Sequence, residues 1–221
     1  MLFDAYPGAI LVSDSSGEDA TTLIREVLLN LDRANKWREE RIQKILDFVE
    51  KQKEYCVSAH NDDEHLTTPD EHGRLLLHKA LADKGVSLGT IKMIFDKQNK
   101  AAHVADNDGL YPLHIASMNC TVDILCHVLG LDKSAVNKVD NEGNNILHAA
   151  CKTGNLKVIE YIIHRHGSLA SKANNKGQFP IVTLLDKDGK EGNITKTAEY
   201  TGVIMKMLLA YPEFVVPAIE C

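Results

Sequence analysis

The sequence predicts an all-α fold, a solenoid of stacked helix-turn-helix repeats, and two observations lead to that prediction. A short motif occurs three times: Gly, then four residues later Leu-His, one further residue and Ala, with the glycines 36 and 34 residues apart. A fourth copy, which lacks the His, opens another 34 residues later. A fixed period near 34 residues is typical of proteins in which each repeat packs only on its neighbours. The four glycines are Gly73, Gly109, Gly143 and Gly177.

Composition limits the classes of function. Of the 221 residues 44% are hydrophobic but only 5% aromatic, which indicates an ordered chain with an aliphatic core. The net charge of −6 disfavours nucleic acid and anionic membranes as partners, since both need a basic surface. Five cysteines without a Cys-x-x-Cys pair, and no basic leader, favour a reducing compartment. We expect an intracellular protein without membrane insertion, cytoplasmic, with the nucleus as the alternative.

The part before the motif is less regular. Residues 1–17 are expected to be the tail of a preceding repeat, because Ala5-Tyr6-Pro7 resembles Ala210-Tyr211-Pro212 near the other end of the chain. Residues 18–69 contain two stretches with helical periodicity, followed by an acidic linker. These stretches are interpreted as an N-terminal helical segment, either a degenerate repeat or a helical cap.

Each repeat is expected to open with a turn and a short helix. Asp or Asn at the start of the turn can accept hydrogen bonds from backbone amides, and Gly supplies a positive φ. Pro112 and Pro180 stand where the first helix should begin, a position that tolerates a missing N–H. The expected repeats are residues 70–105, 106–139, 140–173 and 174–217.

The second helix of each repeat carries larger aliphatic residues at helical spacing, for example Val158, Ile159, Ile162 and Ile163. These side chains are expected to form a continuous core. Gly167 is expected to end the third repeat as a left-handed cap. In the fourth repeat a polar insertion, about residues 186–199, is expected before a second helix at 203–211.

Together these motifs resemble the ankyrin-repeat family. The resemblance rests on Asp-x-x-Gly, on a Leu-His-x-Ala helix start preceded once by Pro, and on Gly154 between the third pair of helices. It covers about residues 70–217. Cys120 departs from the family's Gly between the helices, and Val182 from its His. The resemblance implies a protein-protein interaction module without catalysis or a cofactor.

No group of residues points to catalysis, a cofactor or a metal. The three recurring histidines should lie about 10 Å apart in a stack of helices, too far to share a metal ion. We expect them to be buried and hydrogen-bonded to the backbone; they are His78, His114 and His148. Asn137 matches the position at which ankyrin repeats are hydroxylated, although a plain turn residue is the reading we favour.

The resemblance places the partner on the concave face, at the hairpin tips and first helices. The partner is expected to be a protein, with a basic stretch, that meets an amide-rich surface with two apolar contacts. The alternatives are a permanent subunit of a large assembly and a regulatory fragment of a longer enzyme or channel. The candidate binding residues are Glu71, His72, Arg74, Asn107, Asp108, Leu110, Met118, Asn119, Asn141, Glu142, Asn144, Lys152, Thr153, Asn175, Lys176 and Gln178.

Overall fold

The computed structural model describes residues 68–97, 99–191 and 198–210, together with Asp47, Glu50, Lys51 and Glu54. The expected repeat tail at 1–17 and nearly all of the helical segment and linker at 18–69 lie outside the described residues. The same holds for residues 192–197 and for the stretch from 211 onward. Every regular element in the described part is a helix, as the sequence predicts.

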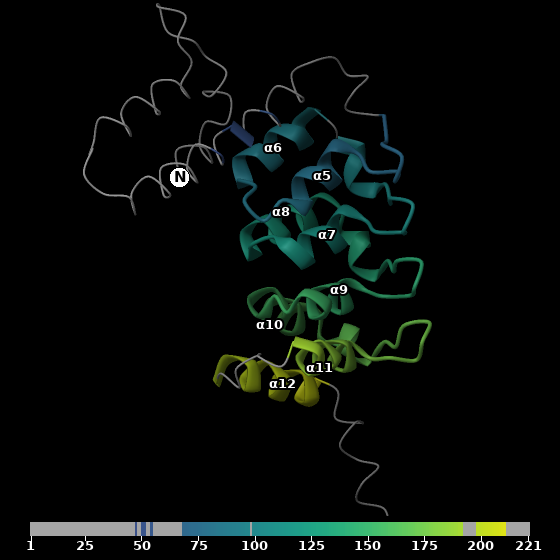
Figure 1. The fold of residues 1–221 in the computed structure, drawn as a ribbon, viewed down its shortest axis with the longest axis vertical. Helices are drawn as coiled ribbons and strands as arrows, with labels where there is room; N and C mark the ends of the chain where they lie inside the picture. The colour runs from purple at the N-terminus through teal and green to yellow at the C-terminus, as the bar shows by residue number, and fades with distance from the viewer. Residues whose placement is uncertain are drawn as a thin grey trace, which may run out of the picture.

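In the described part of the chain, four helix pairs lie one above the other, and the hairpins that connect them project to one side (Figure 1). Short 3-10 helices, η2 (Asn99–His103), η3 (Lys133–Asn137) and η4 (Gly167–Ser171), follow the first three pairs. Helices α7 and α11 begin at Pro112 and Pro180, as predicted. The pairs are α5 (Leu76–Ala82) with α6 (Leu88–Lys97), α7 (Pro112–Asn119) with α8 (Val122–Leu131), α9 (Ile146–Thr153) with α10 (Leu156–His166), and α11 (Pro180–Glu191) with α12 (Ala198–Ala210).

The core runs through the stack without interruption. Small residues on the first helices, such as Ala116 and Ala150, are fully buried and let neighbouring repeats approach closely. Larger residues on the second helices, such as Ile159 and Ile162, are also buried and fill the space between the helix layers. Burial of these aliphatic surfaces drives the stacking, because no repeat can bury its apolar faces alone.

Each hairpin is built from one short polar side chain and one glycine. In the third hairpin the Oδ1 atom of Asp140 accepts hydrogen bonds from the backbone amides of Glu142 and Asn144, at 2.9 and 2.8 Å. Gly143 follows with φ 78°. Asp70, Asp106 and Asn174 make the same pair of bonds in the other hairpins. The expected turn chemistry is confirmed.

The recurring histidines are buried and bond to the backbone, and His148 joins the third repeat to the fourth. His148 is 1% exposed; its Nδ1 accepts a hydrogen bond from the Asn145 amide at 3.2 Å, and its Nε2 donates to the Gln178 carbonyl at 2.9 Å. His78 and His114 accept the equivalent amide bonds at 3.2 and 3.3 Å. These observations confirm the structural role that the sequence predicts for them.

Three local features differ from expectation. Gly167 has φ −54° and opens η4, so it is not a left-handed cap; the chain turns there through a 3-10 helix instead. Cys120 ends α7 in an extended conformation (φ −97°), so a side chain is accepted where Gly154 has φ 71°. Helix α11 continues through the first part of the expected insertion, and α12 begins five residues before Val203.

Candidate functional site

A groove of about 700 Å³ lies along the hairpins and first helices of the second to fourth repeats. Leu110 and Met118 of the second repeat and Ala149 of the third give it an apolar part. The remaining lining residues are polar or charged: Asp108, Asp140, Asn141, Glu142, Asn144, His148, Lys152, Asn174, Lys176, Gln178, Thr183 and Asp186. These fifteen residues are called the groove below.

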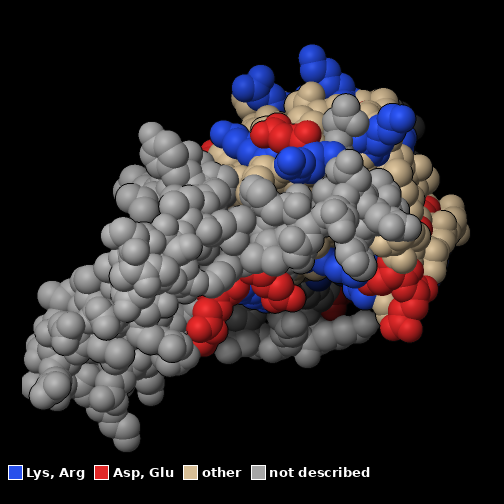
Figure 2. Space-filling model, turned by 90° about the horizontal axis from the view of Figure 1, so that it is seen from above, with Lys and Arg blue, Asp and Glu red and all other residues tan. Residues whose placement is uncertain are grey.

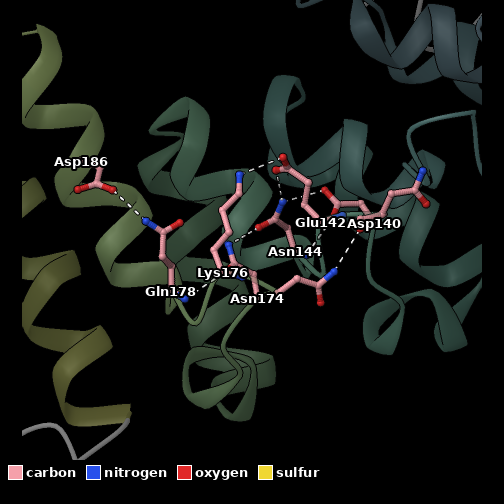
Figure 3. A network of polar contacts seen from close by, with 9 residues as sticks. Asp140, Glu142, Asn144, Asn174, Lys176, Gln178 and Asp186 are labelled. Carbon is pink, nitrogen blue, oxygen red and sulfur yellow. Dashed lines mark hydrogen bonds and ion pairs between the residues drawn. The ribbon is translucent and has the colours of Figure 1, made fainter.

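A chain of hydrogen bonds holds the wall of the groove (Figure 3). The side-chain amide of Asn144 donates to Asp140 Oδ2 at 3.0 Å and to Glu142 Oε2 at 3.2 Å. Asn174 Nδ2 donates to Asn144 Oδ1 at 2.8 Å, which links the third hairpin to the fourth. Asn144 and Asn174 are each only 9% exposed, so this network fixes the spacing of the two hairpins.

The charges of the groove are unbalanced. Four carboxylates line it, on Asp108, Asp140, Glu142 and Asp186, against two ammonium groups, on Lys152 and Lys176. Lys176 Nζ lies 3.1 Å from Glu142 Oε1, and this hydrogen bond together with that from Asn144 lowers the pKa of Glu142. Seen from the α5–α6 end of the stack, acidic side chains are also present beside basic ones at the edge to which the hairpins project (Figure 2). The groove therefore carries an excess of negative charge.

His148 contributes no charge to this balance near neutral pH. Burial lowers the pKa of its imidazole, and the opposing effect of the Gln178 carbonyl is smaller. The ring stands at the back of the groove as a fixed hydrogen-bonding group.

Nine of the sixteen candidate binding residues line the groove. They are Asp108, Leu110, Met118, Asn141, Glu142, Asn144, Lys152, Lys176 and Gln178. Glu71, His72 and Arg74 lie in the first hairpin, outside the groove, where Arg74 Nε is 3.3 Å from Asp70 Oδ2. Asn119 is partly buried at the end of α7.

Several candidate residues have a structural role that the sequence did not reveal. The side-chain amide of Asn107 donates to the Glu71 carbonyl at 3.1 Å, that of Asn141 to the Asn107 carbonyl at 2.9 Å, and that of Asn175 to the Asn141 carbonyl at 3.2 Å. These bonds form a ladder along the hairpin tips, called the asparagine ladder below. Thr153 likewise donates to the Met118 carbonyl at 2.9 Å.

Six groove residues were absent from the sequence-based set: Asp140, His148, Ala149, Asn174, Thr183 and Asp186. Asp140, His148 and Asn174 belong to the recurring framework of the repeats, and the structure shows that framework residues also line the groove. Asp186 was placed in the polar insertion, but it lies on α11 and accepts a long hydrogen bond, 3.4 Å, from Gln178 Nε2.

Asn137 lies outside the groove. It is the last residue of η3 and is exposed, three residues before Asp140 opens the third hairpin. Within the described residues, no group of His, Cys, Asp and Glu is arranged to hold a metal ion. None of the helices described is long and apolar enough to cross a bilayer.

Comparison with known proteins agrees with this architecture. A family model described as ankyrin repeats (3 copies) matches residues 77–176. No curated protein matches the chain. Ankyrin repeats are in general protein-protein interaction modules and typically have no catalytic activity.

Proposed function

Residues 77–176 are ankyrin repeats, and on this premise we propose that the chain is a protein-interaction module that binds its partner in the groove. One observation carries the proposal: side chains from three repeats, most of which do not recur from repeat to repeat, converge on a single concave surface. Side chains that do not pack in the core can vary in chemistry from repeat to repeat, while the scaffold beneath them stays rigid.

The chemistry of the groove favours a basic segment of the partner. Four carboxylates against two lysines would attract Lys or Arg side chains and repel acidic ones. Leu110 and Met118 would accept an apolar side chain between the basic ones. An extended segment suits this arrangement, because successive side chains could reach the acidic and the apolar parts in turn.

The proposal can be tested with two double variants that make the same change of charge. In one, Asp108→Lys is combined with Asp186→Lys, which places two lysines in the groove. In the control, Asp96→Lys is combined with Asp123→Lys on α6 and α8, where both carboxylates are exposed and lie outside the groove. Each protein is used to capture partners from a lysate, and the captured proteins are quantified by mass spectrometry.

We expect the native protein and the control to retain a common set of proteins that the groove variant loses. The unfolding midpoints of the two variants should stay close to the native value, because all four side chains are on the surface. Retention of the same proteins by both variants would overturn the proposal, since the matched charges leave only the position of the change to explain a difference.

A further inference from the structure

The two lysines that line the groove differ in what they contact. The Nζ atom of Lys176 lies 3.1 Å from Oε1 of Glu142, which belongs to the preceding hairpin (Figure 3). Lys152, on α9, lines the same groove but makes no ion pair with any residue that the structure describes. One lysine of the groove therefore already occupies a carboxylate that could receive a cation of the partner.

The carboxylate of Glu142 is held in place by the scaffold. Its Oε2 atom accepts a hydrogen bond from Asn144 Nδ2 at 3.2 Å. Asn144 is only 9% exposed and also bonds to Asp140 and Asn174. The backbone carbonyl of Glu142 accepts a further bond from the Asn175 amide at 2.9 Å. Glu142 is thus a positioned acceptor whose Oε1 atom is left for a cation.

The side chain of Lys176 is held much less firmly. It is 62% exposed, and that of Glu142 is 54% exposed. The backbone of Lys176 does not depend on its side chain, because its amide donates to Asn174 Oδ1 at 3.0 Å and any residue except proline can make this bond. An exposed pair of long side chains adds little stability, since water competes for both charges and both chains must be ordered. Another cation can therefore replace the Lys176 ammonium group at little cost.

The arrangement of the hairpin tips places this lysine beside the acidic part of the groove. The last three tips carry Asp108, Glu142 and Lys176, each directly before its glycine. The Asp108 carbonyl accepts a hydrogen bond from the Asn141 amide at 3.1 Å, and the Glu142 carbonyl accepts the equivalent bond in the next hairpin. The three tips therefore follow one another in equivalent steps. Glu142 has a carboxylate neighbour on one side and an ammonium neighbour on the other.

We propose that Lys176 is an internal competitor of the partner: it holds Glu142 in the free protein and yields this carboxylate to a basic side chain of the bound segment. The inference rests on the proposed function and adds how the groove is regulated. The released ammonium group returns to water, where an exposed lysine is well solvated. A segment whose basic side chain cannot reach Glu142 leaves the internal pair in place. Loss of the charge of Lys176 strengthens binding.

The test uses the full chain and two capped peptides, Ala-Arg-Ala-Leu-Ala-Arg-Ala and the same peptide with Glu in place of Arg. Affinities are measured by titration calorimetry at low ionic strength, where exposed charges are screened least. Lys176→Gln should bind the arginine peptide about two- to fivefold more tightly than the native chain, the scale of an exposed ion pair. Lys152→Gln removes the same charge from the groove without breaking the pair and should tighten binding less. The glutamate peptide should bind to none of these proteins.

A Glu142→Gln background separates competition from the general effect of charge. In this background Lys176 has no carboxylate to hold. Lys176→Gln should then change the affinity for the arginine peptide no more than Lys152→Gln does. The new amide keeps a carbonyl oxygen that can accept the bond from Asn144, so the hairpin should keep its structure. Unchanged unfolding midpoints check this for every variant.

The ion pair can also be measured without a ligand. The hydrogen bond from Lys176 is the largest cause of the lowered pKa of Glu142, whereas Lys152 has the smallest effect on it. An NMR titration of the side-chain carboxyl group should therefore show a clear rise of the Glu142 pKa in the Lys176→Gln protein. The rise in the Lys152→Gln protein should be smaller.

Two results would overturn the inference and leave the proposed function intact. One is binding of the arginine peptide with equal affinity by the native chain and Lys176→Gln, or with equal gains in Lys176→Gln and Lys152→Gln. The other is an unchanged pKa of Glu142 in Lys176→Gln, because the pair would then not form in solution. A third result, no binding of the arginine peptide by any of the proteins, would overturn the inference and the proposed function together.

Discussion

The side-chain amide of Asn141 donates a hydrogen bond to the backbone carbonyl of Asn107, 2.9 Å away in the preceding hairpin. The Oδ1 atom of the same side chain lies 2.5 Å from the position that a Cβ atom would take at Gly109. Asn141 is exposed, yet its side chain bonds to the preceding hairpin and lies close against the backbone at Gly109. An exposed polar residue at a hairpin tip is thus part of the scaffold, and the glycine before it leaves room for the contact.

The first prediction separates two reasons for glycine at these positions: the positive φ angle and the space that the Asn side chain of the next hairpin occupies. Gly143 and Gly177 have nearly equal φ angles, 78° and 73°, so Ala introduces similar backbone strain at either site. Only at Gly143 would the new Cβ collide with Asn175. Gly143→Ala should therefore reduce the free energy of unfolding by about 1–3 kcal/mol more than Gly177→Ala, measured by urea denaturation. Equal losses would mean that φ alone selects glycine.

The second prediction concerns pH and the buried histidines. Burial lowers the pKa of His78, His114 and His148 below the usual 6.5. Below pH 6.5 the unfolded chain therefore binds more protons than the folded one, so stability falls as the pH drops through this window. Denaturation at a series of pH values should show the fall. His148→Gln should reduce the slope, whereas His164→Gln, at an exposed site on α10, should leave it unchanged.

The slope is the decisive quantity here, because His148→Gln also removes the bonds to Asn145 and Gln178 and lowers stability at every pH. An identical slope in the His148→Gln and His164→Gln proteins would contradict the account of the buried imidazoles.

The third prediction concerns two thiols. Burial raises the pKa of Cys120 to about 12 and moves that of Cys151 further above its usual value. The thiolate is the reactive form, so neither residue should be alkylated by iodoacetamide at mildly alkaline pH while the protein is folded. Peptide mapping by mass spectrometry should find both modified only after denaturation. Rapid labelling of Cys120 in the folded protein would show that the α7 end opens readily.

The turns, helix starts and buried histidines of the repeats could be predicted from the sequence, because each depends on residues that are close together in the chain. The Asp-x-x-Gly turns, the helix starts at Pro112 and Pro180 and the buried histidines each depend on residues a few positions apart, and all are found. Gly167 was assigned wrongly for the same reason. Its type suggested a left-handed cap, but the chain continues into η4, where an ordinary helical conformation suffices.

Contacts between repeats could not be predicted from short sequence patterns. The asparagine ladder joins residues 34 or 36 positions apart, and nothing in the local sequence distinguishes an exposed Asn that binds a neighbour from one that is free. Asp186 was assigned to an insertion because its neighbours are polar; only the extension of α11 brings it into the groove. Residues that reach the site through packing between repeats can be identified only from the structure.

The account makes one central claim: the asparagine ladder holds the stack, and the charged side chains of the groove bind the partner. Asn107→Asp removes a ladder donor outside the groove, whereas Asp108→Lys with Asp186→Lys changes only the groove. The most direct test measures the free energy of unfolding and the affinity for the captured partner on both proteins. Asn107→Asp should lose about 1–2 kcal/mol of stability with its affinity unchanged. The groove variant should lose about tenfold or more in affinity with its stability unchanged. Loss of both properties together in either protein would contradict the claim.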